Sequence, residues 1–184
     1  MVIIIVGGPP NSGKSTLAES LARVMQNIGI DAEAVDSDPF SPTLRYIRGE
    51  ITKKERDTLK RHNITEQDIN DIIDRLKQSH QKHKVVIADA PGGISENIKP
   101  VYKLADYAII LCRDDKSGEI SDWRNFLEKI KIQIIAIIIS KTEGEESITN
   151  GKLVRGTLVG LDRKPIDTPP IRRLALILKS KLGL

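Results

Sequence analysis

The sequence predicts an α/β fold of three layers, in which a mainly parallel sheet is covered by helices on both faces. Long apolar runs recur along the chain, for example at residues 2–6, 85–88 and 132–139. Segments with apolar residues at helical spacing separate these runs. Apolar strands that alternate with helices are typical of parallel sheets buried between two helical layers. We expect residues 1–184 to form a single domain, because no convincing linker interrupts this alternation.

The predicted strands and helices follow one another in order. Strands are expected at residues 2–6, 32–35, 85–88, 107–112, 132–139 and 153–159. Helices are expected at residues 14–27, 52–62, 65–83, 95–104, 122–131 and 169–182. Thr65, Ser121 and Thr168 stand where residues that cap a helix N-terminus are expected.

The order of the strands in the sheet is also predicted. We expect the strand at 2–6 in the centre, between the strands at 32–35 and 85–88. The polar stretch that follows Glu143 and ends at Gly151 is expected to be a loop. The strand at 153–159 is a candidate for one arm of a hairpin.

Composition limits the classes of protein. Charged residues make up 29% of the chain and the net charge is +4, which permits contact with a polyanion without requiring it. Aromatic residues are only 3%, too few for a base-stacking surface. No apolar run approaches the ~20 residues of a membrane span, and the first apolar run is a strand rather than a signal peptide. A single cysteine, Cys112, excludes an internal disulfide, and a cytoplasmic protein without membrane contact is expected.

Residues 8–16, Gly-Pro-Pro-Asn-Ser-Gly-Lys-Ser-Thr, carry the strongest functional motif. They lie between an apolar strand and an amphipathic helix, which is the order of a phosphate-binding loop (P-loop). Gly8 and Gly13 allow a turn whose N–H groups point inward, and the helix N-terminus adds positive potential. Lys14 is expected to reach the β- and γ-phosphates, and the Ser15 hydroxyl to bind Mg²⁺. The residues expected to contact nucleotide here are Gly8, Asn11, Ser12, Gly13, Lys14, Ser15 and Thr16.

Acidic residues follow two other predicted strands, and ligands of open parallel sheets bind at the carboxyl ends of strands. Asp89 ends the strand at 85–88, as the metal-binding aspartate of P-loop proteins does, and is expected to hold Mg²⁺ with Ser15. Gly92, three residues later, is expected to present its N–H group to the γ-phosphate. Asp36 and Asp38 are the candidates that position water or accept a proton. Asp38 is the preferred candidate because it lies further from the strand. Which of the two carboxylates faces the γ-phosphate stays open. The alternative is that both side chains only cap the loop.

Residues 41–64 form a basic helical insert. Its positive side chains are Arg45, Arg48, Lys53, Lys54, Arg56, Lys60 and Arg61. Such an insert serves as a lid, as a clamp for a phosphoryl acceptor or as a surface for a protein or nucleic acid partner, and an arginine in it would stabilise charge on a transferring phosphoryl group. A solvated helix face is the alternative.

Three further groups of residues have weaker interpretations. Residues 140–143, Ser-Lys-Thr-Glu, loosely match the base-reading signature of GTPases, with a polar loop as the alternative. His62, His80 and His83 have no neighbours spaced as metal ligands. Cys112 and Trp123 are expected in the core.

Three motifs together resemble the partition-ATPase and signal-recognition branch of P-loop proteins. They are the P-loop at 8–16, the Asp-Ser-Asp-Pro turn at 36–39 and the Asp-Ala-Pro-Gly-Gly segment at 89–93. This resemblance implies a P-loop NTPase fold with a switch that responds to the γ-phosphate. Gly7 and Gly8 stand where partition ATPases carry an extra lysine, so a homodimer held by that lysine does not follow from the resemblance.

Other parts of the chain resemble two further families. The ATPase-like domain found fused to a CRISPR-associated ring nuclease is similar at residues 7–15, 89–93, 95–97, 105–111 and 123–126. The nuclease module itself is absent from these matches, so its activity does not carry over. Uridine-kinase-like enzymes share the Gly-Gly-x-x-x-Ser-Gly-Lys pattern, and would make Asp38 the base for a substrate hydroxyl.

The sequence thus predicts Mg²⁺-dependent binding and hydrolysis of a nucleoside triphosphate, ATP first and GTP second, as a conformational switch. A CRISPR-associated setting and a homodimer are among the expectations that come from the resemblances. The first alternative is a P-loop kinase that transfers the γ-phosphoryl group to a hydroxyl of a small molecule or a polynucleotide. The second is a non-catalytic module that binds a partner and is stabilised by nucleotide, with the basic 45–61 stretch as the surface for protein or nucleic acid.

Overall fold

Seven strands join in one sheet in the computed structural model, which describes residues 1–61, 63–162 and 164–184. The strands are β1 (Val2–Gly7), β2 (Ala32–Asp36), β3 (Val85–Asp89), β4 (Tyr107–Arg113), β5 (Gln133–Lys141), β6 (Ser147–Thr149) and β7 (Val154–Val159). Their order across the sheet is β2-β3-β1-β4-β5-β7-β6. All neighbouring pairs are parallel except β6 and β7, which are antiparallel.

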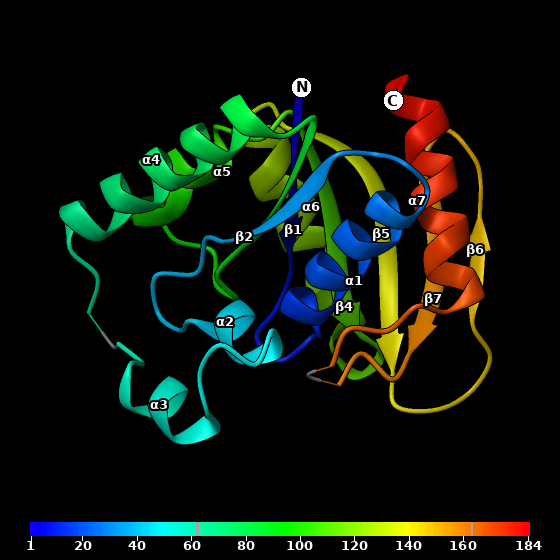
Figure 1. Cartoon of the computed structure of the whole chain (residues 1–184). Coiled ribbons are helices and arrows are strands. Elements are labelled where there is room, and N and C mark those ends of the chain that lie inside the picture. Colours follow the sequence, from blue (N-terminus) through cyan, green and yellow to red (C-terminus); the bar gives the residue numbers. More distant parts are fainter. Residues whose placement is uncertain (62, 163) are drawn as a thin grey trace.

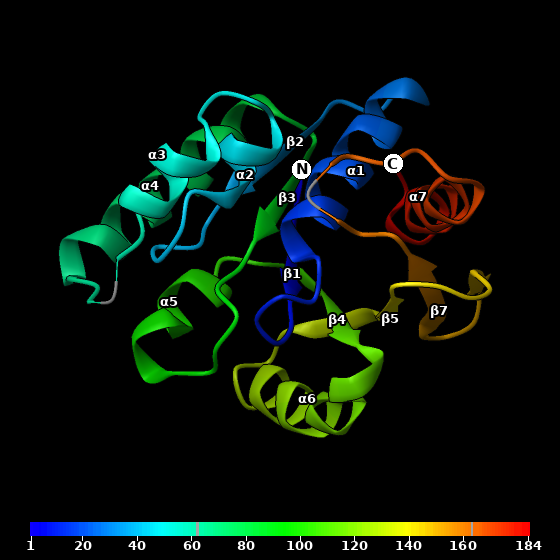
Figure 2. The ribbon, with the colours of Figure 1, turned by 90° about the horizontal axis from the view of Figure 1, so that it is seen from below.

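Helices cover both faces of this sheet, so the predicted three-layer α/β fold is confirmed (Figures 1 and 2). The helices are α1 (Lys14–Asn27), α2 (Thr43–Ile47), α3 (Lys53–Thr58), α4 (Glu66–Lys82), α5 (Lys99–Tyr102), α6 (Ile120–Lys129) and α7 (Pro169–Leu182). Helices α1 and α7 pack on one face, and α4, α5 and α6 on the other. Within the described residues, none of the helices is both long and apolar enough to cross a membrane.

Strand β1 shows how the apolar runs build two cores. Its side chains alternate between the faces, because the side-chain period of a strand is two. Val2, Ile4 and Val6 join the core beneath α1 and α7, whereas Ile3 and Ile5 join the core beneath α4, α5 and α6. Every residue of β1 is buried, so a continuous apolar run is what this position in the sheet requires.

One of the two strands predicted to pair with β1 is correct. Strand β3 pairs with β1 as expected, but the other neighbour is β4, and β2 lies at the edge beyond β3. The residues explain this order, since β3 is buried throughout whereas β2 carries the half-exposed Glu33. An edge strand tolerates a charged side chain better than a central one.

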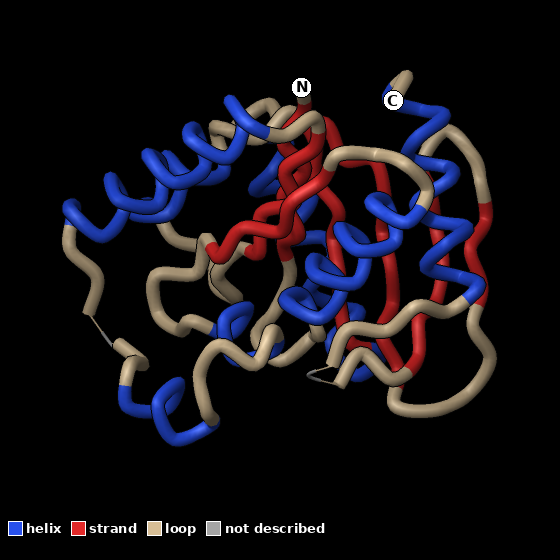
Figure 3. Tube along the Cα trace, viewed as in Figure 1, coloured by secondary structure: helices blue, strands red, loops and turns tan. Residues whose placement is uncertain are grey.

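The insert between β2 and α4 differs from its prediction. The helix expected over 52–62 is present as α3 but ends at Thr58, and a second short helix, α2, precedes it where none was expected (Figure 3). Thr52 caps α3 through a capping box with Glu55. His62, the last residue of the expected helix, lies outside the described residues. That His62 is no metal ligand therefore stays a prediction.

The capping predictions have mixed outcomes. Thr65 caps α4 as expected, and its hydroxyl accepts the N–H of Asp68. Ser121 does not cap α6, because the 3₁₀ helix at Asp114–Glu119 runs directly into it and leaves no extended residue for a cap. Thr168 precedes α7 in extended conformation, with proline in the first turn, but its side chain makes no capping bond.

Two segments correct the expected loops and helices. The predicted helix at 95–104 is a 3₁₀ helix, Glu96–Ile98, followed by the short α5. The stretch expected to be a loop up to Gly151 contains β6. Strand β6 pairs with β7 as the second arm of a hairpin, so the hairpin interpretation of 153–159 is confirmed.

Candidate functional site

The glycines of the P-loop are fixed by close contacts with other strands and loops. Gly8 has φ of +146°, and a Cβ there would lie 1.9 Å from the carbonyl oxygen of Leu111. Gly13 has φ of +89° and stands directly before α1; a Cβ there would lie 2.7 Å from the Cβ of Leu161. No L side chain fits either position, so the loop depends on glycine at both.

Hydrogen bonds hold the loop between these glycines. The Ser12 hydroxyl and the Lys14 ammonium both donate to the carbonyl oxygen of Pro9, at 2.8 and 2.9 Å. Ser140, at the end of β5, donates to the carbonyl oxygen of Ser12 at 2.8 Å. Residue 140 belongs to the stretch interpreted as a base-reading signature, and its observed role is to support the P-loop.

Lys14 is the cation at the centre of the loop, and it is almost fully buried. Burial lowers its pKa, while the carboxylates of Asp89 and Asp38 act in the opposite direction. A buried ammonium beside carboxylates and beneath an open cavity is suited to neutralising phosphate.

A cavity of about 700 Å³ opens over the P-loop at the carboxyl end of the sheet. It is large enough for a nucleotide, since pockets for small ligands typically span roughly 300–1,000 Å³. The predicted site residues that line it are Asn11, Ser12, Gly13, Lys14, Ser15, Thr16, Asp38, Asp89 and Gly92. Gly8 and Asp36 do not line it: Gly8 packs against β4, and Asp36 lines a second pocket.

Asp89 ends β3 and has a buried carboxylate with an unused oxygen. Its side chain is 1% exposed and lies close to the Ser15 side chain, and its Oδ2 has no partner among the described residues. Burial raises the pKa of Asp89 to about 7, against the opposing influence of Ser15 and Lys14. An unpartnered carboxylate oxygen beside a hydroxyl fits Mg²⁺, which often binds one or two protein oxygens together with phosphate oxygens. Ser15 and Asp89 are therefore the residues able to hold this metal.

Asp36 and Asp38 differ in what they face. Asp38 lines both the phosphate cavity and the second pocket, and its Oδ1 accepts the N–H of Phe40 at 2.8 Å. Asp36 stands beside Asp89 in the β2–β3 register and accepts the N–H of Asp38 at 3.3 Å. Burial raises the pKa of Asp38, and burial together with Asp89 and Asp38 raises that of Asp36 well above its usual range. Of these two carboxyls, only Asp38 lines the cavity over the P-loop.

The segment 89–93 packs directly on the P-loop. A Cβ on Gly92 would lie 2.8 Å from the backbone N and Cα of Pro10. A Cβ on the next residue, Gly93, would meet nothing within 4 Å. At Gly92 the loop after β3 is thus in close contact with the P-loop, so a displacement of one loop would displace the other.

The basic insert contributes to the cavity from the opposite side. Arg56 is 5% exposed, stacks on the Tyr46 ring at 4.8 Å and bonds to Asp57 at 2.6 Å. Arg56 and Lys60 both line the phosphate cavity. Arg48 bonds to Glu19 of α1 at 2.8 Å, which ties the insert to the helix that follows the P-loop.

Several residues on the cavity were missed by the sequence analysis, among them Arg113, Leu161 and Asp162. Arg113 ends β4, and the other two follow β7, so the rule that ligands bind at carboxyl ends of strands would have found them. Lys141 and Glu143, by contrast, do not line the cavity, and Lys141 lies 3.5 Å from Asp114.

These features define the class of protein: the chain has the nucleotide-binding P-loop fold shared by ATPases and kinases. The family described as "Chromatin associated protein KTI12" matches residues 1–94, just over half of the 184-residue chain. The chain belongs to this family. The matched part runs from β1 through the insert and α4 to the loop after β3, and so contains most of the phosphate cavity. No curated protein sequence matches the chain significantly.

Solved structures show the same fold at low sequence identity. A plasmid partition protein from Borrelia burgdorferi has a TM-score of 0.65 and 16% identity, covering 100% of this chain and 99% of its own. A nucleotide-binding protein in complex with ADP from Archaeoglobus fulgidus has a TM-score of 0.59 and 14% identity, covering 97% and 88%. The septum site-determining protein MinD complexed with Mg-ADP from Pyrococcus horikoshii has a TM-score of 0.53 and 19% identity, covering 75% and 69%.

These likenesses bear on the resemblances drawn from the sequence. The fold of the partition-ATPase branch is confirmed by its structures. None of the matches described above is named as CRISPR-associated, and that resemblance stays a sequence-based prediction.

Proposed function

We propose that this protein binds a nucleoside triphosphate with Mg²⁺ and hydrolyses off its γ-phosphate. The loop after β3 would then change conformation when the γ-phosphate is lost. The observation that carries the proposal is the 700 Å³ cavity over the P-loop, on which Lys14, Ser15, Asp38 and Asp89 converge. These are a cation for phosphate, two oxygen ligands for a metal and one carboxylate for a nucleophile, which are the parts that phosphoryl transfer needs.

The P-loop and Lys14 would bind the phosphates. Lys14 bonds to the carbonyl oxygen of Pro9 at 2.9 Å, and a γ-phosphate would replace that oxygen as the partner of the ammonium. Ser15 and Asp89 would hold Mg²⁺, which neutralises charge on the phosphate oxygens when bound. Arg56 and Lys60 add positive charge from the insert side of the same cavity.

Asp38 would orient the attacking water. Its carboxylate lines the cavity and retains one oxygen beyond the bond from Phe40, which gives it capacity to accept a hydrogen bond from a nucleophile. Gly92 touches Pro10, so loss of the γ-phosphate and rearrangement of the P-loop would be transmitted to residues 89–93.

ATP is the favoured nucleotide. Two of the structural relatives described above carry ADP, one of them with magnesium. Asp162 on the cavity rim is a carboxylate that would accept hydrogen bonds from guanine, so GTP is the competing ligand to measure.

The test is Lys14→Ala, assayed for nucleotide binding and phosphate release with Mg²⁺ and ATP or GTP. We expect binding and turnover to be lost, because the buried ammonium on the cavity floor is removed. Lys103→Ala, an exposed lysine that does not line the cavity, is the control and should behave as the wild type. Equal turnover in Lys14→Ala and the control would refute the assignment of the site.

A kinase is the second candidate, and a specific observation favours it. The phosphate cavity and the second pocket share Asp38, so a hydroxyl in the second pocket would reach the same carboxylate as water does. Transfer of labelled phosphate from ATP to an acceptor, measured against phosphate release without one, separates kinase from hydrolase.

A further inference from the structure

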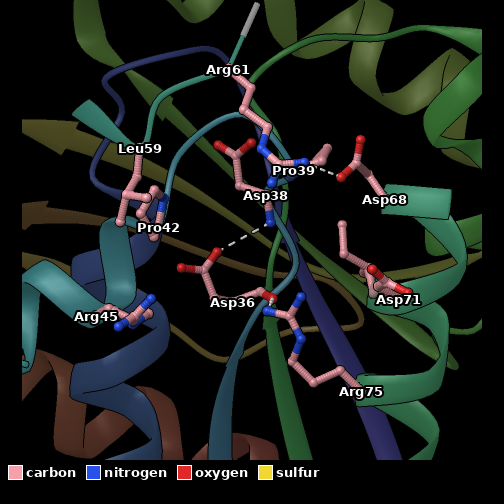
Figure 4. A pocket seen from close by; sticks show the side chains of 11 residues that line it. Asp36, Asp38, Pro39, Pro42, Arg45, Leu59, Arg61, Asp68, Asp71 and Arg75 are labelled. Carbon is pink, nitrogen blue, oxygen red and sulfur yellow. Dashed lines mark hydrogen bonds and ion pairs between the residues drawn. The ribbon is translucent and has the colours of Figure 1, made fainter. Parts of the chain in front are cut away.

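The two acidic loops beside the P-loop are held in place to different degrees. In the loop after β2, Arg75 of α4 donates to the main-chain oxygen of Asp36 at 3.2 Å. The Asp36 carboxylate accepts the N–H of Asp38 at 3.3 Å, and the Asp38 carboxylate accepts the N–H of Phe40 at 2.8 Å. Figure 4 shows the side chains of Asp36, Asp38 and Arg75 around the second pocket. Hydrogen bonds thus restrain this loop along its length.

The loop after β3 is anchored as far as Ala90. The main-chain oxygen of Asp89 accepts the Ser37 hydroxyl at 2.7 Å. The N–H of Ala90 donates to the carbonyl oxygen of Val6 at 3.3 Å. The proposed metal-binding residue is therefore held between β1 and the end of β2.

Residues 91–94 follow this anchored part with few hydrogen bonds. Within the part of the chain that the structure describes they make one, which the Tyr102 hydroxyl donates to the carbonyl oxygen of Pro91. Ile94, at the end of this stretch, is exposed. The stretch also contains Gly92, whose N–H is expected at the γ-phosphate, so this N–H lies in the part of the loop that is best able to move.

Tyr102 contacts both the start of the P-loop and the loop after β3. It ends α5 and is 0% exposed. A Cβ on Gly7, the last residue of β1, would lie 3.3 Å from the Tyr102 hydroxyl and 3.3 Å from the Trp123 ring. The rings of Tyr102 and Phe126 meet edge to face, with their centroids 5.1 Å apart. One buried side chain thus packs on the backbone before the P-loop and donates to the loop after β3.

The bond from Tyr102 to Pro91 is longer than its type prefers. The donor and acceptor oxygens are 3.4 Å apart, whereas bonds between two oxygens are commonest at roughly 2.7–2.8 Å. The ring is not free to close this gap, because Trp123 and Phe126 pack against it. A movement of residues 91–94 toward the hydroxyl would close it and strengthen the bond. A ligand shifts a conformational equilibrium only through contacts that differ between the two states, and this bond is such a contact.

We propose that Tyr102 is a positioning residue for recognition of the γ-phosphate. When a nucleoside triphosphate binds, residues 91–94 move toward Tyr102, the bond to the Pro91 carbonyl shortens, and the Gly92 N–H is held against the γ-phosphate. A nucleoside diphosphate has no γ-phosphate for Gly92 to bind and leaves the loop in the position that the structure shows. This role rests on the proposed nucleotide site and names the residue through which that site distinguishes triphosphate from diphosphate.

Tyr102→Phe tests this role through the binding of ADP and of a non-hydrolysable ATP analogue, each with Mg²⁺. The substitution keeps the ring and its packing and removes only the hydroxyl. We expect the Kd for the analogue to rise by about fivefold, the loss expected for one hydrogen bond between uncharged groups, and the Kd for ADP to stay unchanged. Tyr107→Phe makes the same change at the first residue of β4, at the opposite end of the strand from the cavity, and should change neither Kd.

Trp123 supplies a second readout, because it is the single tryptophan of the sequence and its ring centroid lies 6.1 Å from that of Tyr102. In the wild type, the ATP analogue should change the tryptophan fluorescence more than ADP does. In Tyr102→Phe the two nucleotides should give the same response. Equal responses of the wild type to the two nucleotides would overturn the proposal without recourse to a variant.

The Kd values separate a positioning role from a merely structural one. A hydroxyl that only stabilises the fold would, when removed, lower Tm and weaken ADP and the analogue alike, and that result would overturn the proposal. Tighter binding of the analogue by Tyr102→Phe would overturn it as well, because the bond would then hold the loop away from the γ-phosphate.

The outcomes also separate this proposal from the one on which it rests. If the wild type binds both nucleotides and Tyr102→Phe has the same ratio of Kd values, the role of Tyr102 is overturned and the nucleotide site stands. If the wild type binds neither nucleotide, the nucleotide site and the role of Tyr102 are overturned together.

Discussion

Replacing Gly92 by alanine tests whether the loop after β3 and the P-loop move together. The added Cβ would lie 2.8 Å from the backbone of Pro10, closer than non-bonded carbon atoms come. Because both partners are backbone, no side chain can rotate away, and one loop must move. Overpacking of this kind costs about 1–3 kcal/mol of unfolding free energy. For a chain of this length, each kcal/mol lowers Tm by roughly 2–4 °C.

Gly93→Ala is the matched control. It makes the same chemical change one residue later, at a position where a Cβ meets nothing within 4 Å. Thermal unfolding and the Kd for ATP with Mg²⁺ should both be measured for the two variants. We expect Gly92→Ala to lower Tm and weaken nucleotide binding, because the displaced loop is part of the phosphate cavity. Gly93→Ala should leave Tm unchanged, and because Gly93 also lines the cavity, its Kd shows what a methyl group there does without a clash. Identical Tm and Kd for the two variants would refute the coupling between the loops.

Three further predictions concern single groups at the site. The pKa of Asp89 is about 7 in the folded protein against its ordinary 3.8, so the stability of the metal-free protein should fall as the pH rises between these values. Asp89→Asn should make this fall shallower and lose Mg²⁺-dependent turnover, with the remaining slope coming from Asp36 and Asp38, whose pKa values are also raised. Urea unfolding from pH 4 to 8 in chelator gives the slope, and an equal slope in both proteins would contradict the assignment. Ser140→Ala should destabilise the protein by about 1 kcal/mol and weaken ATP binding, because it removes the 2.8 Å hydrogen bond to the carbonyl oxygen of Ser12 in the P-loop. Ser147→Ala, at an exposed position of β6, is its control. Gly8→Ala should yield no soluble folded protein, because its Cβ would overlap the Leu111 carbonyl oxygen, and a wild-type unfolding transition for this variant would refute the contact.

Local signals allowed parts of the fold to be predicted closely. Helix α1 spans Lys14–Asn27 as expected, because the glycine before it, the helical spacing of its apolar residues and Gly29 after it are all close in sequence. The capping box of Thr65 and Asp68 is equally local. The P-loop residues lie together on one cavity for the same reason: a single turn of chain builds most of it.

Features that depend on distant parts of the chain were harder to predict. The position of β2 at the sheet edge follows from its pairing with β3, and only the half-exposed Glu33 hints at it in the sequence. The contribution of Leu161 and Asp162 to the cavity depends on β7 pairing with β5, whose Ala136 pairs with Val154 eighteen positions further along the chain. The second pocket requires α4 to pack beside the end of β2, and no single motif encodes that contact.

The insert also has an arrangement with consequences for how the protein diversifies. Its two ends meet, since the N–H of Arg61 donates to the carbonyl oxygen of Phe40 at 2.9 Å. A segment whose ends are joined can lengthen or shorten with a small entropic cost and without shifting the register of any strand. Its residues Arg45 and Arg56 lie on different pockets, so changes within this one segment would alter what is bound beside the nucleotide while leaving Lys14, Ser15 and Asp89 in place. Selection can therefore act on ligand choice and on phosphate chemistry as separate traits.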